Sequence, residues 1–90
     1  MAKFIIERQI PGAGKLTNLE LQAISQKTSR IIEKMNSKIE WVRSYVTDDK
    51  VFCEYNAMSR AAVEEHVRES GFKCDQILQV RNVFGPLVSD

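Results

Sequence analysis

The sequence has few of the residues that most often build metal and catalytic centres, with one histidine and two cysteines among its 90 residues. Closed metal sites usually combine several imidazoles or thiolates, so the sequence does not indicate such a site. Cys53 and Cys74 lack the CxxC spacing and are expected to be free, half-buried thiols. Since no nucleophile–base pair and no cofactor fingerprint is evident, the sequence favours a protein that is not an enzyme.

An excess of one charge sign and a long hydrophobic run are also lacking. With 13 basic and 12 acidic residues, no overall field attracts the protein to nucleic acid or to an anionic membrane. The first apolar run, at 4–6, is too short for a signal peptide or a membrane span. We therefore expect a cytoplasmic protein without nucleic-acid or membrane partners, folded as one domain at 3–84 with a tail at 85–90.

Glycine and proline are scarce, at four and two residues, and three of them lie between 11 and 14. They predict a loop after the first strand. The segment GAGK at 12–15 is similar to a phosphate-binding loop, but Gln9 stands where that motif needs glycine. Leu16 stands where the motif needs serine or threonine, so we interpret the segment as a loop without phosphate chemistry.

The rest of the sequence alternates between strand and helix patterns. Strands are predicted at 3–10, 39–47, 50–57 and 75–84. Helices are predicted from the N-cap Thr17 to about Asn36 and from the N-cap Ser59 to Gly71. With right-handed crossovers, this β-α-β-β-α-β order predicts an α+β, ferredoxin-like sandwich: a four-stranded antiparallel sheet with two helices on one face.

The segment WVRSYVTDDKVFCEYNA at 41–57 predicts a hairpin with two different faces. If Asp48 and Asp49 form the turn, one face pairs Val46 with Val51, Ser44 with Cys53, and Val42 with Tyr55. The other face pairs Tyr45 with Phe52, Arg43 with Glu54, and Trp41 with Asn56. Trp41, Tyr45 and Phe52 would form a large apolar patch, so we predict a homodimer through this face, in a dimeric α/β-barrel-like assembly. A ligand pocket lined by aromatic residues between the two sheets is the alternative.

A few polar residues are candidates for a site. His66 lies beside the apolar stripe of the second predicted helix, either as a hydrogen-bonded core residue or as a ligand for a metal such as nickel. Glu69 shares its helical face, and Glu7 lies in the middle of a central strand, where a carboxylate needs a partner. The candidate metal ligands are therefore His66, Glu69 and Glu7, and the candidate small-molecule-binding residues are Glu7, Tyr45 and Tyr55.

Three segments together resemble domain-of-unknown-function family 4242 over residues 3–84: FIIERQIPGAGKLTNLELQAISQKT, IEWVRSYVTDDKVFCEYNA, and AAVEEHVRESGF followed by QVRNV. The resemblance implies a ferredoxin-like, dimeric protein, in a family whose best-described branch is regarded as nickel-binding. The matching polar positions are Glu7, Trp41, Ser44, Tyr45, Cys53, Tyr55 and His66. Two functions follow as hypotheses. One is a homodimer that binds nickel or another divalent transition metal; the other is a small-molecule binder or enzyme with a pocket near Glu7, Tyr55 and His66.

Overall fold

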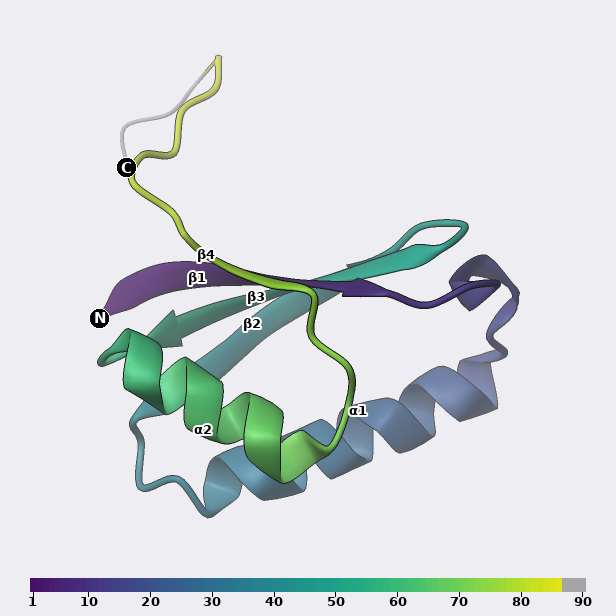
Figure 1. The fold of residues 1–90 in the computed structure, drawn as a ribbon, viewed down its shortest axis with the longest axis horizontal. Helices are drawn as coiled ribbons and strands as arrows, with labels where there is room; N and C mark the ends of the chain where they lie inside the picture. Colours follow the sequence, from purple (N-terminus) through teal and green to yellow (C-terminus); the bar gives the residue numbers. More distant parts are fainter. Residues whose placement is uncertain (87–90) are drawn as a thin grey trace.

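The computed structural model describes residues 1–86, in which a four-stranded sheet carries two helices (Figure 1). Strand β1 (Ala2–Gln9) leads through the short helix η1 (Ala13–Lys15) into α1 (Asn18–Glu33). The hairpin of β2 (Ile39–Val46) and β3 (Lys50–Ala57) follows, and then α2 (Arg60–Ser70) and β4 (Gln76–Gln79). The strand order is β2-β3-β1-β4, and all neighbours are antiparallel. The predicted ferredoxin-like fold is confirmed; of the predicted tail, residues 87–90 lie outside the described part.

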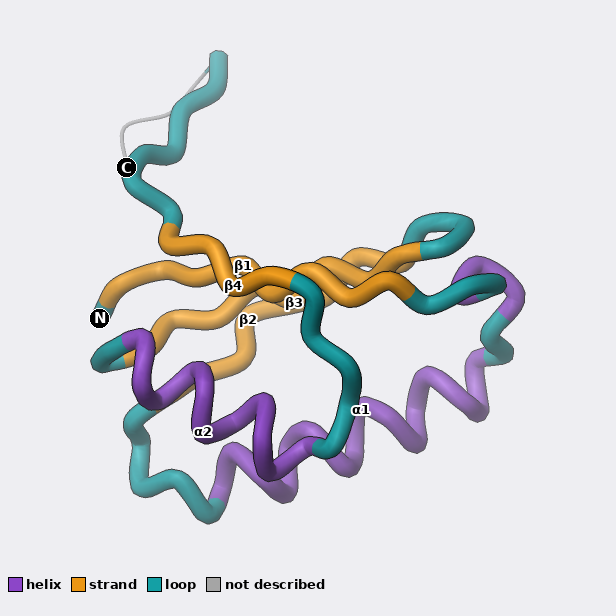
Figure 2. The backbone as a smooth tube through the Cα atoms, viewed as in Figure 1, coloured by secondary structure: helices purple, strands orange, loops and turns teal. Residues whose placement is uncertain are grey.

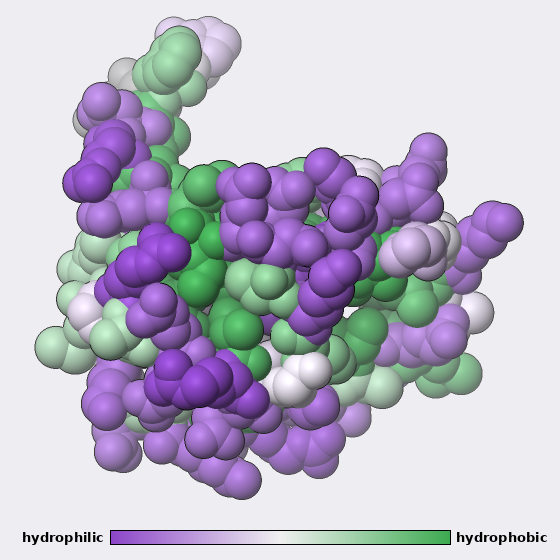
Figure 3. Space-filling view, viewed as in Figure 1, coloured by the Kyte–Doolittle hydropathy of each residue, from purple (hydrophilic) through white to green (hydrophobic). Residues whose placement is uncertain are grey.

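Both helices lie on one side of the sheet (Figure 2). The buried core lies between the sheet and the helices, with residues from β1, β2, β3 and α2. Phe4 and Ile6 of β1, Tyr55 of β3 and Val63 of α2 are each 2% exposed or less. Figure 3 shows hydrophobic residues gathered in the middle of the view, with hydrophilic side chains above and below them. Among residues 1–86, no helix is long and apolar enough to cross a membrane.

The helix ends follow from local sequence signals. Thr17 and Glu20 form the predicted capping box at the start of α1, and Ser59 caps α2 by accepting a hydrogen bond from the Ala62 N–H. Gly71 ends α2 in the left-handed region, at φ 68°. Helix α1 ends at Glu33, three residues before the predicted end. Asn36 adopts the left-handed backbone conformation, at φ 53°.

Strand β4 is shorter than predicted, since it covers Gln76–Gln79 and not 75–84. It pairs with β1 from Glu7 back to Phe4, and the Val80 N–H donates one further hydrogen bond to the Lys3 carbonyl. In this register Ala2, the first residue of β1, lies opposite Arg81, so β1 offers no backbone partner for residues 82–84 of the predicted strand.

The register of the hairpin agrees with the prediction near the turn and departs from it farther along. Thr47 and Lys50 flank the turn, and the pairs from Val46–Val51 to Arg43–Glu54 are as predicted. A β-bulge at Val42 then shifts the register, so that Trp41 lies opposite Tyr55 rather than Asn56. The prediction that Trp41 lies on the open face is therefore wrong, because one extra residue turns its side chain to the helix side.

Candidate functional site: a cavity between the sheet and helix α1

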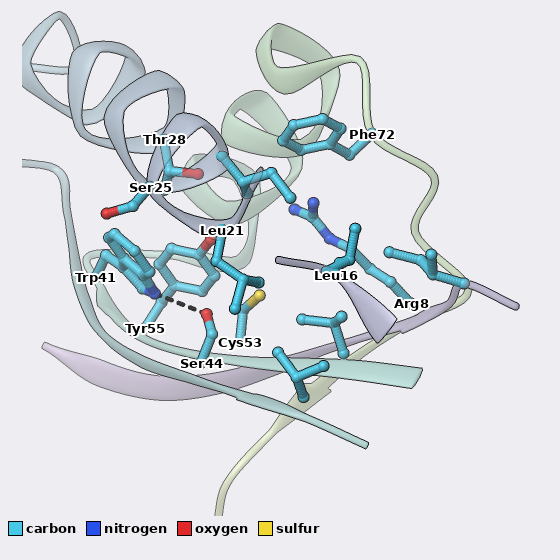
Figure 4. Close-up of a pocket in the computed structure, with 14 residues that line it drawn as sticks. Arg8, Leu16, Leu21, Ser25, Thr28, Trp41, Ser44, Cys53, Tyr55 and Phe72 are labelled. Carbon is cyan, nitrogen blue, oxygen red and sulfur yellow. Dashed lines mark hydrogen bonds between the residues drawn. The ribbon is translucent and has the colours of Figure 1, made fainter. Parts of the chain in front are cut away.

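A cavity of about 380 Å³ lies between the helix-facing side of the sheet and α1 (Figure 4). Its volume falls within the usual range for small-molecule sites. Most of its lining is apolar: Ile10, Leu16, Leu21, Ile24, Trp41, Val46, Val51, Cys53, Tyr55 and Phe72. Arg8, Ser25, Thr28 and Ser44 are the other lining residues. The composition is that of a pocket for an apolar molecule with a few polar contacts.

Arg8 brings a positive charge into this apolar lining. Strand alternation places Phe4, Ile6 and Arg8 on the same face of β1, so that the side chain of Arg8 points toward the helices and the residue is only 5% exposed. Its Nε atom is buried without a hydrogen-bond partner, and no carboxylate of residues 1–86 lies within salt-bridge distance of the guanidinium. Its Cζ atom lies 5.1 Å from the centroid of the Phe72 ring, a cation–π distance.

Two aromatic side chains form the opposite part of the cavity in Figure 4. The bulge directs Trp41 inward, where its indole Nε1–H donates a hydrogen bond of 2.9 Å to Ser44 Oγ. The Tyr55 hydroxyl lies 2.9 Å from Nε2 of His66, and the two ring centroids are 4.9 Å apart. Burial raises the pKa of the Tyr55 hydroxyl well above its usual value, so this group stays protonated at neutral pH.

His66 lies behind Tyr55 and is fully buried, as the core-residue alternative predicted. Burial, with a smaller effect of the Arg8 charge, lowers the pKa of His66 to about 4. The imidazole is therefore neutral at physiological pH. Its Nδ1 atom is buried and has no hydrogen-bond partner among the described residues.

The GAGK loop is held against the hairpin turn by backbone hydrogen bonds, and its neighbours Ile10 and Leu16 line the cavity. The Ile10 N–H donates to the Asp49 carbonyl at 2.9 Å, and the Gly14 N–H donates to the Asp48 carbonyl at 3.0 Å. A Cβ atom at Gly14 would come within 3.1 Å of the Asp48 Cα, so the close approach favours glycine. The loop positions Ile10 and Leu16 in the cavity wall, a structural role for a motif that suggested phosphate binding.

The structure separates the residues that the sequence analysis grouped into sites. Glu7 lies on the open face of the sheet and forms a salt bridge of 3.1 Å with Lys50. Tyr45 lies opposite Phe52 on the same open face and is 52% exposed. Tyr55 and His66 lie on the other side of the sheet, so the predicted pocket near Glu7, Tyr55 and His66 is corrected: the cavity includes Tyr55 but not Glu7. The alternation of side chains along β1 is the reason.

The predicted metal ligands are not brought together either. His66 is buried, whereas Glu69 is exposed on α2 and Glu7 lies beyond the sheet. No group of three or more His, Cys, Asp or Glu side chains in the described part of the chain is arranged to hold a metal ion. Nε2 of His66 already contacts Tyr55, and the Arg8 cation nearby would repel a metal ion. Within one protomer these residues do not fit a nickel site.

The open face of the sheet retains part of the predicted apolar patch. Tyr45 and Phe52 lie there as predicted, and the register adds Ile5 and Leu78. Leu78 is 47% exposed. The salt bridges of Glu54 with Lys3 and with Arg43 lie in the same face. Trp41 is absent from this patch, and the homodimer stays a prediction.

Arg8 and Phe72 line the cavity but were not among the predicted site residues. A signal for Arg8 was present, since it continues the apolar alternation of Phe4 and Ile6 in the first strand. Phe72 gave no such signal, because it lies in the irregular segment between α2 and β4. Cys53 lines the cavity, and Cys74 lies two residues before β4. Both are free thiols, as predicted.

Comparison with known proteins gives a relationship over most of the chain. No curated protein matches the sequence. Among solved structures, the crystal structure of SCO4226 from Streptomyces coelicolor A3(2) is similar, with a TM-score of 0.73 and 19% sequence identity. The similarity covers 98% of this chain and 100% of that one and concerns the fold. Residues 4–80 match the family described as nickel responsive protein SCO4226-like, and the comparisons do not support the predicted label of family 4242. The chain therefore belongs to the SCO4226-like family of nickel-responsive proteins.

Proposed function

We propose that this protein binds a small, largely apolar organic molecule in the cavity between the sheet and α1. The observation that supports the proposal is the cavity itself, about 380 Å³ in volume and lined mainly by aliphatic and aromatic side chains. The pocket is partly open to solvent, so its apolar lining meets water when no ligand is bound. An apolar ligand in the pocket would remove that surface from water.

The single tryptophan of the chain makes the proposal testable, since Trp41 lines the cavity. Neutral apolar probes such as cyclohexanol, benzyl alcohol and octanol are titrated while tryptophan emission is recorded. We expect a saturable change in the intensity or the wavelength of the emission, because the probe displaces water beside the indole.

A matched pair of variants locates the binding. Val51 lines the cavity, so Val51→Phe fills part of its volume and should abolish the saturable signal. Val83 is 49% exposed and lies outside β4, so Val83→Phe should bind as the wild type does. A signal that does not saturate, or that Val51→Phe leaves unchanged, would contradict binding in this cavity.

Nickel binding is a second candidate, favoured by the family to which the chain belongs. Because the residues of one protomer do not fit a nickel site, ligands from two copies of the chain are needed. His66 is the one imidazole of the chain and is neutral at physiological pH, but it is fully buried, so it could act as a ligand only if the packing of α2 against the sheet opened. Calorimetric titration of Ni²⁺ into the wild type and His66→Gln tests this candidate. Equal binding by both proteins would exclude His66 as a ligand.

We also propose a homodimer that forms through the open face of the sheet. The support is the apolar patch of Ile5, Tyr45, Phe52 and Leu78, since a small domain gains stability by covering such a surface.

The two free thiols favour a reducing compartment and so support a cytoplasmic location.

A further inference from the structure

Arg8 lines the cavity, its Nε atom is buried without a hydrogen-bond partner, and its guanidinium forms no salt bridge among residues 1–86; these features point to the class of ligand. We propose that the ligand is a small organic monocarboxylate, with its carboxylate on Arg8 and its apolar body against Trp41 and Tyr55. The inference rests on the proposed function, which it makes more specific.

The positive charge of Arg8 has no counterion in the described part of the chain. The residue is 5% exposed, and its Nε–H is buried without an acceptor. A guanidinium does not lose its proton in a protein, so the charge cannot be avoided by deprotonation. Phe72 contributes a cation–π contact, but an aromatic ring does not accept the hydrogen bonds of the fork. An anion bound in the cavity would supply both the counterion and the hydrogen-bond acceptors that Arg8 lacks.

The surroundings of Arg8 add to its attraction for an anion. Lys27 places a second cation 4.5 Å from the centroid of the same Phe72 ring. Neither cation forms a salt bridge among residues 1–86. Lys27 does not line the cavity, so the lining itself holds one positive charge and no acidic residue. One charge favours a monoanion over a phosphate dianion, and the planar fork of arginine matches the two oxygens of a carboxylate.

The arrangement of the lining indicates the rest of the ligand. In Figure 4 the guanidinium of Arg8 lies near Phe72 on one side, whereas Trp41 and Tyr55 lie on the other with Leu21 between. The indole N–H of Trp41 is satisfied by Ser44, and the hydroxyl of Tyr55 is paired with His66. Both rings therefore present mainly apolar surface to the cavity. A flat or branched hydrocarbon body that reaches from the Arg8 side of the cavity to Trp41 and Tyr55 would cover that surface.

Calorimetry with matched probes tests the inference. Phenylacetate, 2-naphthoate and octanoate are each titrated beside the corresponding primary amide, which has the same shape without the charge. We expect at least one acid to bind the wild type tenfold or more tightly than its amide. Arg8→Met should bind that acid no more tightly than the amide. Arg8→Lys, which keeps the charge but loses the fork, should retain part of the preference.

Lys27→Met is the control for the general positive field, because Lys27 is exposed and outside the lining. It should keep the preference for the acid within about twofold, as expected for a screened surface charge. Equal affinity for acids and amides, tighter binding of phenyl phosphate, or a preference that survives Arg8→Met would overturn the inference. Binding of the neutral probes described above, without any preference for acids, would refute the carboxylate class and leave the proposed function standing. Failure of every acid and every neutral probe to bind would refute both.

Discussion

Replacing Arg8 by methionine should make the ligand-free protein more stable, although the substitution removes a large buried side chain. The Nε–H of Arg8 is buried without a partner, and such an unsatisfied group costs about 1–3 kcal/mol, or more when it is charged. The contact with Phe72 returns about 0.5–2 kcal/mol. Methionine is unbranched and can follow the apolar stem of the arginine. We therefore expect Arg8→Met to raise the free energy of unfolding by about 1 kcal/mol.

Urea unfolding, monitored by circular dichroism, measures this change. In a thermal melt, each increase of about 1 kcal/mol in the free energy of unfolding raises the melting temperature of a domain of this size by about 4–8 °C. The matched control is Arg81→Met, since Arg81 is exposed and follows β4. Its effect should stay within about 0.5 kcal/mol. A free energy of unfolding lowered by about 1 kcal/mol or more in Arg8→Met would contradict this expectation, because a loss of that size is the net worth of one hydrogen bond made by the arginine.

Two further predictions concern His66 and the open face of the sheet. Because the folded-state pKa of His66 is about 4 and the unfolded value is 6.5, the unfolded chain binds the additional proton between these values. Stability should fall as the pH drops from 6.5 to 4, by about 3 kcal/mol more in the wild type than in His66→Gln, measured by urea unfolding across pH. Equal pH dependence of the two proteins would contradict the shift. On the open face, Phe52→Glu should split a dimer, whereas Leu19→Glu, on the exposed part of α1, should not. Light scattering decides, and a monomeric wild type at about tens of micromolar would end the dimer prediction.

The fold was predictable from the sequence because its signals are local and agree with one another. Thr17, Ser59 and Gly71 mark helix ends by hydrogen bonding and backbone preference, and these need no tertiary information. The hairpin register near Asp48 and Asp49 followed from turn length. The bulge at Val42 was not predictable, because it depends on the burial of Trp41 against Tyr55 and its hydrogen bond to Ser44.

The site was predicted less well, for a physical reason. Glu7 and Tyr45 were predicted to share a small-molecule site with Tyr55, whereas strand alternation puts Glu7 and Tyr45 on the far side of the sheet. The same alternation places Arg8 inside, and this was open to prediction from the pattern of the first strand. The cavity itself was not, since its volume depends on how α1, the loop at 10–16 and the sheet pack together.

The binding mode is best tested by a crystal structure of the protein with the acid that binds most tightly in calorimetry. We expect ligand density in the cavity between the sheet and α1, with the carboxylate oxygens within hydrogen-bond distance of the Arg8 guanidinium. The hydrocarbon part should lie against Trp41 and Tyr55. Density for the acid on the open face of the sheet, or an acid in the cavity whose carboxylate points away from Arg8, would contradict it.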